Sequence, residues 1–293
     1  MNLHLLPDVL VSSLILGSVY ALIALGVVAI YRATKVLNFA HGQFILLGAY
    51  LVYQFAVGQH LPLVIAAPLG LLVTGLIGAL AYVVFLKPLA GRPLWAPVMV
   101  TVGLATVMTS VMSIVWGSGL RILPFPVKVH AYSLPGNAVI NTYGLVSIVA
   151  MAVVFSGFMA VNKWSQAGAQ MRAAAENPVL AGHRGVNVTL IFAMAWGLAA
   201  VAAGVSGVTF SYSNLLTPGL SALGLRGFAP ALVGGLDSFG GALLGSFCVA
   251  LAENMAATYI GGEVRDAAAF AVILVVLVIR PYGLFGTKEI ERV

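Results

Sequence analysis

Long apolar runs, separated by short polar stretches, decide what this chain can fold into. A helix needs about 20 mainly apolar residues to cross the hydrocarbon core of a bilayer. Eight runs are long, whereas a ninth, over residues 225–236, is too short to cross at about 1.5 Å per residue. The long runs cover residues 9–31, 44–57, 61–86, 97–116, 145–161, 188–210, 240–259 and 267–279. We therefore expect an all-α polytopic membrane protein with about eight long transmembrane helices and one short or broken helix.

Composition excludes a soluble fold. Hydrophobic residues make up 61% of the 293 residues and charged residues only 8%, whereas roughly a quarter of residues are charged in a soluble domain. The runs lack the ten-residue alternation of an outer-membrane barrel. Cys248 is the single cysteine, so no intrachain disulfide can form. We expect one transmembrane domain over residues 1–293 and no soluble domain.

The basic residues between the runs predict an orientation. Ten of them fall on one side of the predicted topology and four on the other, and cytoplasmic loops carry the excess of Lys and Arg. The ten are Arg32, Lys35, Lys87, Arg92, Lys163, Arg172, Arg184, Arg280, Lys288 and Arg292; the four are Arg121, Lys128, Arg226 and Arg265. The N-terminus is thus predicted outside and the C-terminus in the cytoplasm. Basic loops also explain the net charge of +6 without a nucleic-acid partner.

A mildly charged, alanine-rich stretch occupies residues 166–187, within a cytoplasmic loop over about 163–187. Residues 166–176 favour a helix, Asn177 is a natural N-cap, and Pro178 suits the first position of a second helix. Gly185 then provides a stop. Two short helices with a bend would suit a groove on a partner protein, although an ordinary connecting loop is the alternative.

Two polar clusters are candidates for lining a solute pathway. Asn38, His41 and Gln43 lie near a helix break, where they could contact a solute, cap the next helix or bind lipid head groups. Gly234, Gly235 and Asp237 lie in a glycine-rich segment, and irregular backbone at membrane depth must face protein or water. Close helix packing is the alternative for these glycines.

Several chemistries have no support in the sequence. The histidines are scattered, so a metal site is not expected, and no hydrolase motif provides a catalytic residue. The sequence contains no GxxxxGK[ST] phosphate-binding loop, so any dependence on ATP must come from another subunit. Asp237 and Glu253 are the acids expected at membrane depth, where acids are costly. They leave open a secondary carrier driven by an ion gradient.

Four segments resemble the permease subunits of branched-chain amino acid ABC importers. They are GSVYALIALGVVAIYRATKVLNFAHGQFILLGAY (17–50), MRAAAENPVLAGHRGVNV (171–188), GFAPALVGGLDSFGGALLG (227–245) and RPYGLFG (280–286). The resemblance implies a multi-pass protein of the bacterial inner membrane and an importer-permease fold. It implies a heterodimer with a second related permease, two cytoplasmic ATPase subunits that bind ATP and Mg, a periplasmic solute-binding protein, and no cofactor on this chain.

The resemblance also assigns roles to residues. Coupling to the ATPases maps to the 166–187 stretch, at Arg172, Glu176, Asn177, Pro178 and Gly182. For the translocation path, the transport hypothesis itself leads us to expect contributions from Asn38, Phe39, His41, Gln43, Gly234, Gly235 and Asp237. The sequence departs from the usual pattern at Asp237 and at His183–Arg184. Similar permeases also move amides, urea-like solutes and carboxylates. For both reasons, branched-chain amino acids are only the default substrate.

Overall fold

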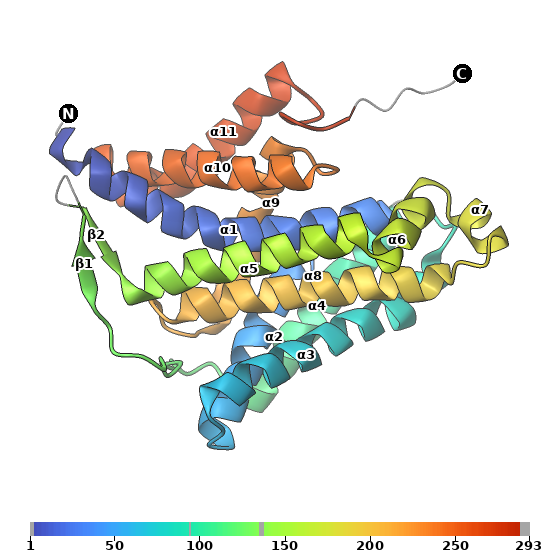
Figure 1. The fold of residues 1–293 in the computed structure, drawn as a ribbon, viewed down its shortest axis with the longest axis horizontal. Coiled ribbons are helices and arrows are strands. Elements are labelled where there is room, and N and C mark those ends of the chain that lie inside the picture. The colour runs from blue at the N-terminus through green and yellow to red at the C-terminus, as the bar shows by residue number, and fades with distance from the viewer. Residues whose placement is uncertain (1–2, 94, 135–137, 288–293) are drawn as a thin grey trace.

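The computed structural model describes residues 3–93, 95–134 and 138–287, which fold into a bundle of helices (Figure 1). The helices are α1 (Leu6–Thr34), α2 (His41–Tyr53), α3 (Leu63–Ala81), α4 (Trp95–Trp116), α5 (Thr142–Trp164), α6 (Gln166–Glu176), α7 (Pro178–His183), α8 (Val188–Ser211), α9 (Leu223–Gly234), α10 (Phe239–Tyr259) and α11 (Arg265–Ile279). Short π-helical or 3-10 turns cover Leu3–Leu5, Gln54–Gly58, Tyr82–Leu86, Lys87–Leu89, Pro218–Ala222 and Gly262–Val264. A hairpin of β1 (Ala131–Ser133) and β2 (Val139–Asn141) pairs Tyr132 with Ile140.

Six helices in the described part are long and apolar enough to cross a membrane. They are Leu6–Thr34, Leu63–Leu89, Trp95–Trp116, Thr142–Trp164, Val188–Ser211 and Phe239–Tyr259. The predicted count of eight long helices is therefore not confirmed. Helices α2 and α11 account for the difference, because they have only 13 and 15 residues. Helix α9, with 12 residues, confirms the short helix predicted over residues 225–236, although it begins and ends two residues earlier.

Helix α1 forms the centre of the bundle and packs against α8, α9 and α10. Every residue of α1 from 17 to 30 is buried. Apolar side chains of a membrane-spanning helix can face lipid, so this burial means that other helices cover α1 on all sides. Glycines allow the close approach: a Cβ on Gly17 would lie 2.4 Å from the Phe247 ring. Small residues at such contacts are the usual basis of helix association in membranes.

Helices α2 and α9 both begin beside the middle of α1. Nε2 of His41, the first residue of α2, lies 3.1 Å from the carbonyl oxygen of Ile23, and a Cβ on Gly227 of α9 would meet the Ile23 side chain at 2.1 Å. The two starts also touch, since a Cβ on Gly224 would lie 2.3 Å from Cα of Gly42. The fold thus places two helix starts at mid-depth rather than at a membrane surface.

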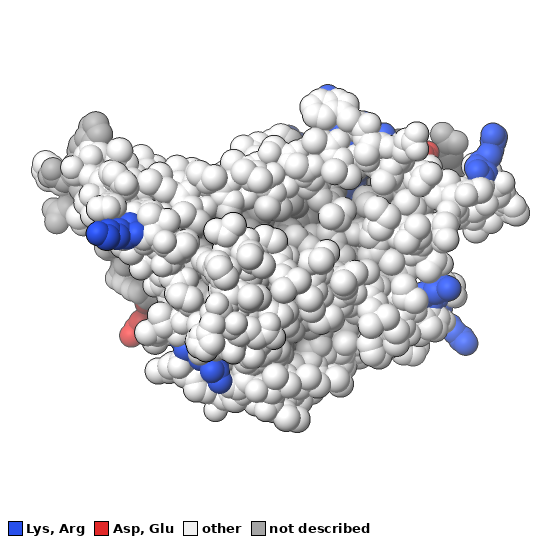
Figure 2. Space-filling view, turned by 60° about the horizontal axis from the view of Figure 1, so that its bottom comes forward, with Lys and Arg blue, Asp and Glu red and all other residues white. Residues whose placement is uncertain are grey.

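Charged side chains are sparse on the surface. On the face that Figure 2 shows, Lys and Arg lie toward the ends and edges of the molecule, with a broad white area between them. In Figure 1 the β1–β2 hairpin lies at one end and α6 and α7 at the other. This distribution fits a protein whose apolar band sits in lipid and whose ends reach water.

Candidate functional site

Two short helices project from one end of the bundle, as the 166–187 stretch predicts. The Ser165 hydroxyl oxygen accepts a hydrogen bond from the Gly168 amide at 3.0 Å and caps α6. Asn177 Oδ1 accepts from the Leu180 amide at 2.9 Å, Pro178 begins α7, and Gly185 has a φ of +83° beyond its end. The predicted cap, start and stop are all confirmed.

The two helices have one face on the bundle and one face exposed. Met171, Ala174 and Ala181 are buried, whereas Val179 and Leu180 are 69% and 55% exposed. The Arg172 guanidinium donates a hydrogen bond to the Asn162 carbonyl at the end of α5, so part of its role is to hold α6 in place. Glu176 and Gly182 are exposed, and a Cβ on Gly182 would meet no described atom within 4 Å. The free surface is therefore centred on α7.

Helix α6 packs against α5, α8 and the end of α1, and Phe239 at the start of α10 lies close by. A small cavity there is lined by residues of α1, α5, α6 and α10, including Arg32, Arg172 and Phe239. The Arg32 guanidinium lies 4.6 Å from the centre of the Phe239 ring, and the Phe158 ring meets Phe239 edge-on at 5.0 Å. A displacement of α6 would therefore be felt directly by the most buried helix of the bundle.

The start of α2 gathers the first group of predicted pathway residues. Asn38 Oδ1 accepts from the Ala40 amide at 3.0 Å, which makes Asn38 part of the turn into α2. His41 Nε2 must donate to Ile23, because a carbonyl can only accept. Asn38 Nδ2, His41 Nδ1 and Gln43 Oε1 are buried and have no hydrogen-bond partner among the described residues. The described part of the chain has seven buried side-chain nitrogen or oxygen atoms without a hydrogen-bond partner, and three of them lie here.

Phe39 and Gln43 also line an open groove of about 390 Å³ between α2 and α4. The other lining residues, all on α4, are Val102, Ala105, Thr106, Thr109 and Ser110. The Phe39 amide donates to Thr101 Oγ1 at 3.2 Å, and Gln43 Nε2 donates to Thr109 Oγ1 at 3.4 Å. The hydroxyls of α4 were not predicted as site residues; the sequence signal for them is Thr106, Thr109 and Ser110 at three- and four-residue spacing inside an apolar run.

The second predicted group, the glycine segment, serves close packing. Gly234 and Gly235 are buried, and a Cβ on Gly234 would lie 2.2 Å from the backbone of Gly241. The loop after α11 returns to this point, where the Leu284 and Phe285 amides donate to the carbonyls of Val233 and Gly234 at 2.9 and 3.0 Å. This loop supplies hydrogen-bond donors that the end of α9 would otherwise lack.

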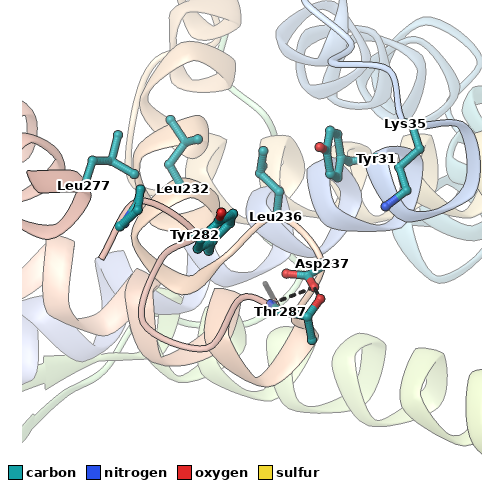
Figure 3. A pocket seen from close by; sticks show the side chains of 9 residues that line it. Tyr31, Lys35, Leu232, Leu236, Asp237, Leu277, Tyr282 and Thr287 are labelled. Carbon is teal, nitrogen blue, oxygen red and sulfur yellow. Dashed lines mark hydrogen bonds between the residues drawn. The ribbon is translucent and has the colours of Figure 1, made fainter. Parts of the chain in front are cut away.

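Asp237 lies beside this packing at a cavity of about 230 Å³ (Figure 3). Its carboxylate accepts from the Thr287 amide at 3.0 Å and from the Thr287 hydroxyl. Figure 3 shows Tyr31 and Lys35 approaching the cavity from the end of α1, with Tyr282 and Leu232 on the opposite side. Gly234, Gly235 and Asp237 are thus close together, but they lie apart from the groove at the start of α2. Lys288 and Arg292, which count toward the predicted orientation, lie outside the described residues.

Glu253 belongs to a buried cluster near the other end of α10. The Tyr20 hydroxyl donates to its carboxylate, 3.1 and 2.9 Å from the two oxygens, and Arg265 Nε lies 3.5 Å from one of them. Arg265 also donates to Asn254 Oδ1 at 2.6 Å, and Asn254 donates to Ser13 at 3.2 Å. We call Ser13, Tyr20, Glu253, Asn254 and Arg265 the outer cluster. It ties α1, α10 and α11 together.

Comparison with known proteins identifies relatives over nearly the whole length. The sequence model of a family described as branched-chain amino acid transport system / permease component matches residues 9–279. The high-affinity branched-chain amino acid transport system permease protein BraD of Pseudomonas aeruginosa is 30% identical, with 97% of both chains covered. The corresponding LivH protein of Escherichia coli K12 is 26% identical, with 95% of this chain and 94% of LivH covered. A chain of PsaBC from Streptococcus pneumoniae, solved in complex with Fab, has a similar fold, with a TM-score of 0.50, 14% identity, and 96% and 94% of the two chains covered.

Proposed function

Because the chain belongs to the family of branched-chain amino acid transport permease components, we propose that it is the membrane subunit of an ATP-driven importer for branched-chain amino acids or related small solutes. It provides part of the path and performs no chemistry. The family match over residues 9–279 is the observation that carries this proposal.

The complete importer contains several further subunits. A second, related permease completes the path, and two cytoplasmic ATPase subunits hydrolyse ATP with Mg, because the sequence contains no phosphate-binding loop. A periplasmic binding protein delivers the solute. The end that carries α6 and α7 faces the cytoplasm, in agreement with the excess of basic residues there, and the N-terminus faces the periplasm across the bacterial inner membrane.

Helices α6 and α7 couple ATP hydrolysis to the bundle. The exposed apolar pair Val179 and Leu180 enters a groove on an ATPase subunit, and the Asn177 cap and Pro178 fix the angle of α7. Glu176 and Gly182 lie at the edge of this contact. Arg172 acts from the opposite side, since it holds α6 against α5. Movement of α6 then reaches α1 and α10 through Arg32 and Phe239.

The path runs past the start of α2, where Asn38, Phe39, His41 and Gln43 interrupt the apolar surroundings at mid-depth. The segment of Gly234, Gly235 and Asp237 contributes near the cytoplasmic end, chiefly by holding α9 and α10 together. Closure of the ATPases changes which side of this path is open.

A secondary carrier would need acidic groups that exchange protons along a route. Asp237 is bonded to Thr287 just before α10, and Glu253 is bonded to Tyr20 near its far end. Sixteen residues of sequence separate them, which corresponds to about 24 Å along a helix. The two acids therefore do not form a relay, and ATP-driven transport is the better supported mechanism.

Reconstitution tests the function. We reconstitute the chain with its partner subunits and binding protein in proteoliposomes. We expect leucine uptake only when ATP is present on the side of the membrane that carries the ATPase subunits. Uptake by this chain alone, driven by a proton gradient and indifferent to ATP, would contradict the proposal.

A substitution in α7 tests the coupling role separately. Leu180→Asp places a charge in the proposed contact, so we expect leucine-stimulated ATP hydrolysis and uptake to fall at least tenfold while membrane insertion is retained. Leu134→Asp, at an exposed position beside the hairpin at the opposite end, is the control. Equal activity of the two variants would remove α7 from the coupling interface. Charge reversal at Glu176 should have a smaller effect of the same kind.

A further inference from the structure

The groove between α2 and α4 carries three hydroxyl groups whose protons are already used. Thr106 donates to the Val102 carbonyl at 3.2 Å, Thr109 to the Ala105 carbonyl at 2.9 Å, and Ser110 to the Thr106 carbonyl at 3.0 Å. A hydroxyl has one proton and two lone pairs, so each of these oxygens now faces its surroundings as an acceptor.

Gln43 also borders this groove, but its unpaired oxygen is buried rather than open to a solute. Its Nε2 donates to Thr109 Oγ1 at 3.4 Å, an assignment that follows because the Thr109 proton is occupied by Ala105. The opposite orientation of the amide would place two acceptors face to face. Gln43 Oε1 is then left buried without a donor among the described residues.

Donors for an anion are scarce at this place. No Lys or Arg is among the residues that line the groove. The backbone amides of Ala40, His41 and Gln43 are also engaged, because Ala40 donates to Asn38 Oδ1 and the other two donate to the carbonyls of Asn38 and Ala40. The unpaired Nδ2 of Asn38 is buried and does not line the groove. A carboxylate would therefore find little to bind, whereas a group that only donates hydrogen bonds would find several acceptors.

The rest of the groove is apolar. Phe39, Val102 and Ala105 complete its lining, and the Phe39 ring lies 5.5 Å from that of Phe228 on α9. An ammonium group has three donors and no acceptor, and a branched aliphatic side chain next to it would contact the apolar part.

We propose that this groove binds the ammonium end of the transported aliphatic amino acid, with the exposed hydroxyl oxygens of Thr106 and Ser110 as acceptors. This inference rests on the proposed function for the identity of the solute. The carboxylate of the amino acid is bound outside this groove. Thr106 and Ser110 are thereby specificity-determining residues that distinguish amino acids from carboxylic acids of the same shape.

Two fragments of leucine test the proposal on the complete transporter, purified in detergent without its binding protein. The fragments are 3-methylbutylamine, which lacks the carboxylate, and 4-methylpentanoate, which lacks the ammonium group. Saturation-transfer NMR should detect binding of the amine and not of the acid. In the variant Thr106→Val/Ser110→Ala we expect the affinity for the amine to fall at least tenfold.

Ser156→Ala is the matched control, because Ser156 is an exposed hydroxyl on α5 that donates to its own helix at 3.2 Å and lies outside the groove. It should leave amine binding within twofold of the wild type. Binding of the acid in place of the amine, or amine binding that is unchanged in the double variant, would overturn the proposal. Leucine uptake by the wild-type transporter separates the groove proposal from the proposed function. If the wild type takes up leucine but the double variant binds the amine normally, only the groove proposal is wrong. If the wild type does not take up leucine, the proposed function is wrong.

Discussion

The outer cluster and the α2–α4 groove are both polar regions among apolar helices, but they differ in whether their polar atoms have hydrogen-bond partners within the protein. In the outer cluster, Glu253 is fully buried and both of its oxygens lie within 3.1 Å of the Tyr20 hydroxyl. In the groove, Gln43 keeps an unpaired oxygen, and Thr106 and Ser110 are exposed. Polar groups that satisfy one another hold helices together, whereas polar groups that remain open can exchange partners with a passing solute.

Removal of the buried acid should have the largest effect on stability. Glu253→Ala leaves the Tyr20 hydroxyl without its acceptor and Arg265 without its opposite charge, although Arg265 keeps its bond to Asn254. We expect the free energy of unfolding to fall by about 3 kcal/mol, at the low end for a broken buried pair because Arg265 is 39% exposed. Reversible unfolding in mixed micelles measures this value.

The exposed ion pair between Arg226 and Asp266, at 2.9 Å, is the control for that measurement. Arg226→Ala should change the free energy of unfolding by less than about 1 kcal/mol. If both variants lost the same amount, burial of Glu253 would not be what distinguishes the outer cluster.

A methyl group on Gly234 should have the next largest effect. The new Cβ would lie 2.2 Å from the backbone of Gly241, which cannot move aside as a flexible side chain could, so we expect a loss of about 2 kcal/mol in the free energy of unfolding. Gly240→Ala is the matched control, because a Cβ there meets no described atom within 4 Å. A Gly234→Ala variant with normal stability and altered uptake would instead identify Gly234 as a pathway residue like those of the groove.

The smallest effect on stability is expected in the groove. Thr109→Val keeps the shape of the side chain and removes two hydrogen bonds, a weak one from Gln43 at 3.4 Å and one to the Ala105 carbonyl at 2.9 Å. Because that carbonyl lies within α4 and keeps its helical backbone partner, we expect the free energy of unfolding to change by about 0.5 kcal/mol or less. The thermal midpoint in detergent should therefore match that of the wild type. A loss as large as that of Glu253→Ala would show that the groove, too, is built for stability.

Local features of the sequence predicted the two-helix element well. Ser and Asn caps, Pro at a first helical position and Gly at a stop act over three or four residues, and Asn177, Pro178 and Gly185 all have their expected places. The short helix at residues 223–234 was also predictable, since length alone excludes a full crossing.

Contacts between distant parts of the chain were not predictable in the same way. Tyr20 and Glu253 are 233 positions apart, and nothing local in either segment indicates that they pair. The start of α2 at mid-depth depends on His41 meeting Ile23, and the assignment of the glycines to packing depends on the return of the loop after α11. Among apolar helices of similar composition, periodicity carries little information about which face is buried.

Leucine uptake per folded transporter, measured together with the thermal midpoint, tests the division between the two regions most directly. We expect Glu253→Gln to lower the midpoint but to keep ATP-driven uptake within twofold of the wild type. We expect Thr106→Val/Ser110→Ala to keep the midpoint and to lose at least tenfold in uptake. The reverse result, with transport lost in the outer cluster and stability lost in the groove, would contradict this division.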